Sequence, residues 1–379
     1  MRKSLYFMPF ITFREFSDTN AVEIEEIRFI KNNGQFDNLM PDILKGKNGV
    51  FVELVNSFCS GDYFNNNICL KIINAIEIFK FSYYITNIPT GDNSNGFISE
   101  SNFELFTIME PSKDETMEHK IRITNGISHF LMSLKDYYQY KCIFGSRNCI
   151  IISKNALIYM KYIYSDCIKD ENKLSIIRLY NKCIRITNFD DSFDKIIFAR
   201  TSIEALLNIE KSLTKKNYIN IFISKVNLFI INHKGINSAL LDFYEKNVIN
   251  DNKLDKSKNN LEIYLENLRN ARHNLLHENK VNMDFMTIEA YITWFPLFFL
   301  ITLFENKLTQ VDIPRLIFFI KLLQLDLNKW NEKNPKYYNR MTCLEIYAQY
   351  VRTITVQMNN SNFVDLDNYI KGFNKCFTD

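Results

Sequence analysis

One short segment concentrates side chains that are suited to acid–base and phosphate chemistry. Between Leu268 and Glu278 lie two arginines, two asparagines and two of the five histidines of the chain. Imidazole accepts and donates protons near neutral pH, and a guanidinium is always charged and can grip two phosphate oxygens. The segment therefore contains residue types that can transfer protons and hold the charge that builds on a reacting phosphate.

The geometry of a regular helix would separate some of these side chains. At about 100° per residue, Arg272 lies about 40° from the centre of the apolar stripe of the segment, and His277 lies about 180° from it. The stripe consists of Leu261, Tyr264, Leu265, Leu268, Ala271 and Leu275. Arg269, His273 and His277 instead share one polar wall, together with Asn270 and Glu266.

If an arginine and His277 are to act together on one phosphate, three arrangements stay open. The helix loosens near His277, or Arg272 and His277 meet through a dimer partner, or Arg269 takes the place of Arg272. A structural interpretation stands beside them, in which Arg272 pairs with an acidic group of another helix. In that interpretation His277 stabilises the helix end, where a cation meets the negative end of the dipole.

Other polar groups give weaker signals. The eight cysteines form no CxxC pair, and no histidine lies at zinc-ligand spacing from a cysteine pair, so we expect free thiols. Asp190, Asp191 and Asp194 have the composition of a metal site, but a helix N-cap at Asp194 explains them better. His119, His129 and His233 are interpreted as ordinary surface or core residues. No metal and no cofactor is predicted.

Long amphipathic helices must position the segment. From Leu174 onward, apolar residues recur at helical spacing. The predicted helices are Asp194–Leu213, Tyr218–His233, Ile236–Ile249, Leu261–Glu278 and Phe285–Asn306. They define a helical bundle over residues 171–310, followed by a helical extension, 311–379, with one helix between Pro314 and Pro335 and another at Cys343–Met358.

Strand-like patterns dominate residues 1–170. Apolar or alternating runs predict strands at Leu5–Phe16, Ala21–Ile30, Phe103–Met109, Ile121–Ile127 and Cys149–Ser153. The stretch Ile68–Tyr84 fits either a helix or a long strand. The predicted fold class is α+β, with a β-rich or α+β domain before the bundle.

The composition indicates a folded protein with an apolar core but does not show whether it binds nucleic acid. The chain has 379 residues, of which 46% are hydrophobic and 23% charged, with a net charge of +3. It can bury a core, and the mild charge neither demands nor excludes a nucleic acid. The apolar run Ala290–Phe304 is shorter than the roughly 20 residues of a membrane span and contains Pro296, so a buried helix is predicted. We expect a soluble, cytoplasmic chain without a membrane partner.

The run from Arg272 to His277 resembles the motif of the HEPN superfamily: an arginine, a polar residue, a few further residues and a histidine. The helix is also similar to that of the Apea-type subfamily, as is the upstream segment 199–207, which reads ARTSIEALL. The resemblance covers residues 171–310.

This resemblance implies an all-α domain that acts as a metal-independent endoribonuclease. Arg272, His277 and His273 would be catalytic, and Arg269, Asn270 and Asn274 would contact RNA, with tRNA as one candidate. Two copies would form a homodimer through the bundle, so that two motifs face one cleft. A bacterial antiphage defence or toxin role is implied, with an antitoxin or a phage-derived trigger, and with residues 1–170 sensing or regulating. The alternative is a HEPN module that dimerises or binds nucleotide or RNA without cleavage.

Overall fold

The protein is described by a computed structural model. It describes residues 4–40, 44–45, 48–55, 66–86, 103–109, 120–124, 129–132, 150–152, 154–185, 192–209, 218–233, 260–278 and 285–308, with 313, 316, 317 and 320. The chain divides into two compact units, residues 1–86 with 92–177, and residues 87–91 with 178–379. Two predicted helices, Ile236–Ile249 and Cys343–Met358, lie outside the described residues, as do most of those between Pro314 and Pro335.

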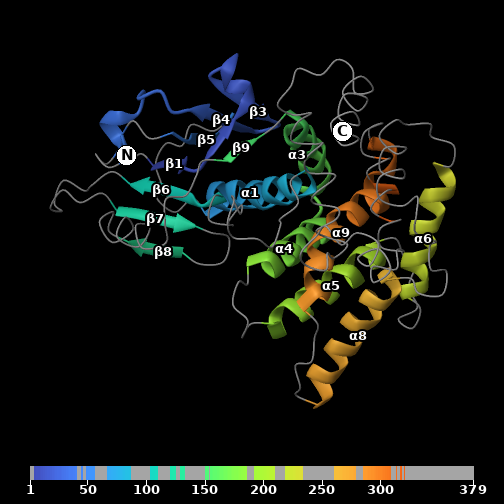
Figure 1. Cartoon of the computed structure of the whole chain (residues 1–379). Coiled ribbons are helices and arrows are strands. Elements are labelled where there is room, and N and C mark those ends of the chain that lie inside the picture. Colours follow the sequence, from blue (N-terminus) through green and yellow to red (C-terminus); the bar gives the residue numbers. More distant parts are fainter. Residues whose placement is uncertain are drawn as a thin grey trace, which may run out of the picture. The chain divides into compact units, whose positions relative to one another are not determined.

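The first unit contains a seven-stranded antiparallel sheet (Figure 1). The strand order is β3-β4-β5-β1-β6-β7-β8, so the N-terminal strand lies in the middle. The strands are β1 (Ser4–Met8), β3 (Ala21–Ile24), β4 (Ile27–Lys31), β5 (Val50–Leu54), β6 (Leu105–Met109), β7 (Lys120–Thr124) and β8 (His129–Met132). A separate parallel pair joins β2 (Ile11–Phe13) to β9 (Ile150–Ile152). Short 3₁₀ turns follow β2 (Arg14–Ser17) and precede β5 (Asp37–Leu39).

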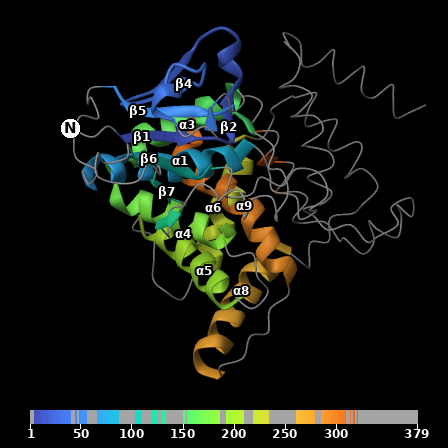
Figure 2. The same ribbon diagram turned by 90° about the vertical axis from the view of Figure 1, so that its left-hand side faces the viewer.

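Two helices pack on one face of this sheet, α1 (Asn66–Thr86) and α3 (Lys154–Cys167), as Figures 1 and 2 show from two directions. Aromatic rings connect the layers. The ring centroid of Phe29 on β4 lies 5.3 Å from that of Phe79 on α1, which lies 5.6 Å from that of Tyr164 on α3. The undecided stretch Ile68–Tyr84 is therefore a helix, whose apolar side chains cover the sheet.

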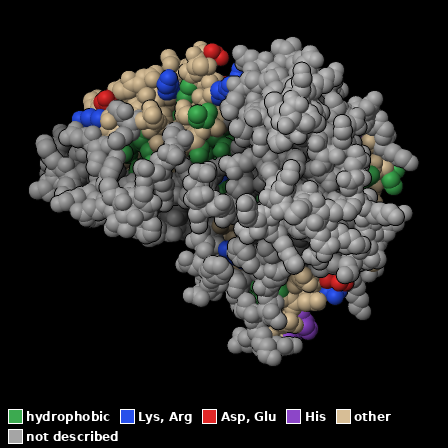
Figure 3. All heavy atoms as spheres, in the orientation of Figure 1, with side chains coloured by type: hydrophobic (Ala, Val, Ile, Leu, Met, Phe, Trp, Pro, Cys, Tyr) green, Lys and Arg blue, Asp and Glu red, His purple; other side chains and the backbone are tan. Residues whose placement is uncertain are grey.

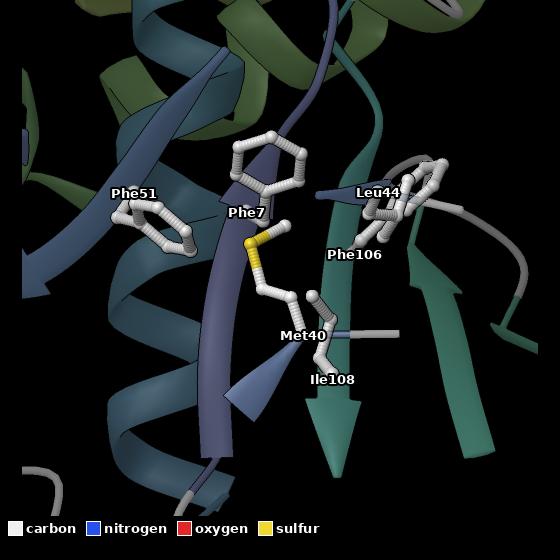
Figure 4. Close-up of a cluster of buried hydrophobic side chains, with 6 residues drawn as sticks. All are labelled: Phe7, Met40, Leu44, Phe51, Phe106 and Ile108. Carbon is white, nitrogen blue, oxygen red and sulfur yellow. The ribbon is translucent and has the colours of Figure 1, made fainter. Parts of the chain in front are cut away.

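The opposite face of the sheet has its own apolar cluster (Figure 4). Phe7 pairs with Phe51 and with Phe106 in the strand register, so the three rings point to the same side. Met40 and Leu44, from the segment before β5, cover them, and Figure 4 shows the side chain of Met40 next to Phe7. The N-terminal segment therefore forms a core strand, as its apolar pattern predicts.

Two predicted strands are divided in the structure. Leu5–Phe16 contains β1, β2 and a 3₁₀ turn, and Ala21–Ile30 forms the hairpin of β3 and β4. The hairpin turns at Glu25, which has a φ of 54°, and Glu26. Ser165 on α3 donates a hydrogen bond to Glu25 (2.6 Å), and Tyr164 donates one to Glu26 (3.2 Å). These contacts fix the tip of the hairpin on α3.

Every described element of the second unit is helical. They are α4 (Glu171–Arg185), α5 (Ser192–Ile209), α6 (Tyr218–Asn232), α8 (Asn260–Glu278), α9 (Phe285–Phe304) and a 3₁₀ turn (Glu305–Lys307). The division between the units lies inside α4, after Ile177. Asp170 caps this helix, because its carboxylate accepts hydrogen bonds from the backbone N–H groups of Asn172 and Lys173. The described part of the chain is thus mixed α and β, with the sheet in the first unit.

Helix α9 lies in the core of the second unit. Phe298 stacks on Phe222 of α6 (3.6 Å between centroids), and Phe295 stacks on Tyr180 of α4 (5.5 Å). The hydroxyl of Tyr291 hydrogen-bonds to that of Ser202 on α5 (2.5 Å). The prediction of a buried helix at Ala290–Phe304 is confirmed, since its described side chains are buried except for the half-buried Thr302 and Leu303. No described helix is both long enough and apolar enough to cross a membrane.

The two described cysteine side chains, Cys167 and Cys183, are free and buried, as the sequence predicts for thiols. Burial raises the pKa of Cys183 to about 12, which outweighs the opposite effect of the nearby Lys195. Because the thiolate is the reactive form, Cys183 is an inert core residue.

Candidate functional site on helix α8

Helix α8 has a buried side and an exposed side. Leu265, Leu268, Ala271 and Leu275 are all buried, which confirms the predicted stripe at the positions whose side chains are described. The helix runs without interruption from Asn260 to Glu278. The idea that it loosens near His277 is therefore wrong.

The exposed side carries the predicted polar wall. Arg269, Asn270, His273 and His277 are exposed, as is Glu266. The rings of His273 and His277 lie next to each other, with centroids 4.6 Å apart and planes inclined at 44°. Figure 3 shows histidine side chains on the surface of the α8 region. The wall is thus an accessible strip of imidazole, guanidinium and amide groups.

Arg272 lies at the border between the two sides. Its side chain is 38% exposed, and its Nη1 lies 3.6 Å from Oε1 of Glu204 on α5. Asn274 is also half-buried. A regular helix turns Arg272 away from His277, because a separation of five residues corresponds to about 140°. The structure thus brings Arg269, Asn270, His273 and His277 together on one side and leaves Arg272 beside α5.

Glu204 is shared by two arginines. Nη2 of Arg200, one turn earlier on α5, lies 2.8 Å from the same Oε1 atom of Glu204, and the Arg200 side chain is only 6% exposed. The three side chains together carry a net charge of +1. The shorter contact shows that Arg200 is the main partner of the carboxylate, and Arg272 is its looser, more exposed partner.

This arrangement has a chemical consequence for Arg272. When its guanidinium swings toward an anion, Glu204 keeps Arg200 as its counter-charge, so no half-buried carboxylate is left uncompensated. The structural interpretation expects Arg272 to pair with an acidic group of another helix, and Glu204 on α5 is such a group. Spacing within the sequence does not identify Arg200 or Glu204 as site residues, although both lie in the upstream segment 199–207 that carries the resemblance.

In the described part of the chain, no three or more His, Cys, Asp and Glu side chains gather in a group. Asp190 and Asp191 lie outside the described residues. Asp194 is the third residue of α5, inside its first turn, so the prediction that it caps the helix is wrong. Its charge there still complements the helix dipole.

Comparison with known proteins adds no relative. No protein-family model matches the chain, and neither a curated protein nor a solved structure matches it. The resemblance to HEPN domains therefore rests on segment 199–207 and on the residues of α8.

Proposed function

We propose that the chain is a metal-independent endoribonuclease of the HEPN type that cleaves RNA by attack of the 2′-hydroxyl. The observation that carries this proposal is the combination on α8 of an exposed Arg269–His273–His277 wall with Arg272, held at its edge by Glu204. Imidazoles at the surface can reach a polymer substrate. A loosely paired arginine can exchange its carboxylate for a phosphate.

In the proposed mechanism His277, assisted by His273, transfers protons to and from the reacting oxygens. Arg272 holds the charge on the phosphorane through its fork. Arg269, Asn270 and Asn274 contact the neighbouring phosphates and sugars. Arg200 compensates Glu204 while Arg272 is bound to the substrate. We extend the proposal to a defence or toxin role in the cytoplasm, under an antitoxin or a phage-derived trigger.

We further propose that two copies pair through the bundle. Because Arg272 and His277 lie on different sides of one helix, the arginine of one copy would serve the histidine of the other. A two-fold dimer is the commonest arrangement of identical chains. Light scattering should give twice the monomer mass at micromolar concentration. A strict monomer that retains full cleavage activity would contradict this expectation.

Cleavage should persist in EDTA and should leave a 2′,3′-cyclic phosphate or the 3′-phosphate derived from it. The reason is that the attacking group is the substrate's own 2′-hydroxyl, and side chains supply the proton transfers and the charge. The purified chain is incubated with cellular RNA in EDTA, and sequencing of the RNA ends then shows whether cleavage occurs and which phosphate the products carry. Strict dependence on added magnesium, or 5′-phosphate products, would contradict the proposal.

A second candidate is a HEPN module that binds nucleotide or RNA, or dimerises, without cleavage. The Arg272–Glu204 contact favours it, since a paired arginine has a structural role without any chemistry. Expression in a bacterial host separates the two. A ribonuclease slows growth and loses this effect in His277→Ala, whereas a binding module gives the same growth in both.

A further inference from the structure

We infer that His273 and His277 form a two-nitrogen site for a divalent transition-metal ion, with preference for Cu²⁺ and Ni²⁺ over Zn²⁺. The inference goes beyond the proposed function, because chelation depends only on where the two rings lie. It concerns added or cellular metal bound at the surface of α8.

The spacing of the two residues is that of a chelating pair. Histidines four residues apart lie on the same face of a helix, the spacing with which the H-E-x-x-H motif binds zinc. In that motif a glutamate follows the first histidine, but here Asn274 occupies that position. The pair therefore supplies the two ligands without the catalytic base of a metalloprotease.

The separation of the rings fits a square-planar ion. Two imidazoles at neighbouring corners, each with a metal–nitrogen bond of about 2.0 Å, have ring centroids about 4.5 Å apart. The observed separation is 4.6 Å. Both side chains are exposed, so small rotations of the rings can turn one nitrogen of each toward a common ion. Tetragonal geometry and nitrogen ligands favour Cu²⁺ and Ni²⁺, and affinity rises to Cu²⁺ along the divalent series.

The helix dipole and the charge of Arg269 have opposite effects on the binding of a cation. His277 lies in the last turn of α8, where the negative end of the helix dipole favours a cation. Arg269, one turn before His273, opposes a cation but is exposed and screened by solvent. Among the described residues His233 is paired with Glu305 (3.3 Å), whereas neither His273 nor His277 has an ion pair with a described carboxylate. No ion pair to a described residue has to be broken before metal binds.

Titration of the 379-residue chain with Cu²⁺, followed by calorimetry and by electron paramagnetic resonance, tests the site. We expect one ion per chain with a two-nitrogen signature. Either His273→Ala or His277→Ala should lower the affinity by at least about tenfold, because loss of even an outer partner of a metal ligand costs about 10- to 100-fold. His233→Ala, the matched control directly after α6, should leave the signature unchanged.

Unchanged Cu²⁺ binding in the double variant His273→Ala/His277→Ala would overturn the inference. Circular dichroism of each variant checks the fold, and His273→Gln, which keeps a polar side chain, replaces any variant that unfolds. The readout does not depend on RNA cleavage. Cu²⁺ binding by a chain without ribonuclease activity would refute the proposed function and leave this site intact. Arg272→Lys should bind Cu²⁺ like the parent chain.

Discussion

Replacing His277 with alanine is expected to slow RNA cleavage by about 10²- to 10⁴-fold, the usual loss when a general acid–base group is removed. The imidazole is exposed on α8, opposite the buried stripe, so its removal takes no side chain out of the core. The melting temperature should therefore stay unchanged. Single-turnover cleavage of a defined RNA, measured beside a thermal melt, gives both quantities.

His233→Ala serves as the matched control for this prediction. His233 belongs to the same unit and contacts Glu305, away from the polar wall of α8, so its loss should leave the cleavage rate unchanged. If both His277→Ala and His233→Ala cut RNA at the full rate, neither histidine is catalytic. The role proposed for His277 would then be wrong.

Replacing Arg272 with lysine is expected to lower the cleavage rate by about 10²- to 10³-fold, by analogy with the removal of one donor from an oxyanion hole. Lysine keeps the charge and loses the planar fork that grips two oxygens. The contact of Arg272 with Glu204 is 3.6 Å long and partly exposed, so its weakening should cost only about 0–1 kcal/mol in stability. Rate and melting temperature therefore separate phosphate binding from a structural role.

Arg269→Lys is the comparison that decides between the two arginines. Arg269 is exposed on the same wall as His273 and His277, where Arg272 does not lie. Full activity in Arg269→Lys with loss in Arg272→Lys assigns the phosphate to Arg272 and requires a second copy to bring it near His277. The reverse result assigns the site to the wall of a single helix. Lower melting temperatures with full activity in both variants would make the arginines structural.

Helices α5, α6 and α8 could be predicted because their apolar residues recur at helical spacing. Ile203 on α5, Phe222 on α6 and Leu268 on α8 belong to these patterns and are buried. The same helical geometry correctly divided α8 into a core side and a polar wall. Helical geometry could not predict the contact of Arg272 with Glu204. That contact between α5 and α8 depends on how the two helices cross, and not on the spacing of residues within either helix.

The first unit shows where sequence patterns failed. Sequence patterns do not reveal the β3–β4 turn, because Glu25 adopts a φ of 54° in a run without the Gly or Asn that normally marks such a turn. They do not predict helix α3 either. It follows β9 almost directly, and its buried residues include Tyr159 and Tyr164, an aromatic type that is equally frequent in strands. Its identity is decided by packing on α1, which local periodicity does not report.

The pairing of β2 with β9 also governs when the first unit can form during protein synthesis. Phe13 finds its partner strand only after Ile152 has left the ribosome, and Tyr164, which packs on Phe79, emerges later still. Closing so long a loop costs entropy before its contacts form, so this unit should fold slowly. A nascent chain that ends before β9 lacks both the strand that pairs with β2 and helix α3, which packs on Phe79. Phe13 and Phe79 are then exposed, and such apolar surface makes the nascent chain a substrate for chaperones.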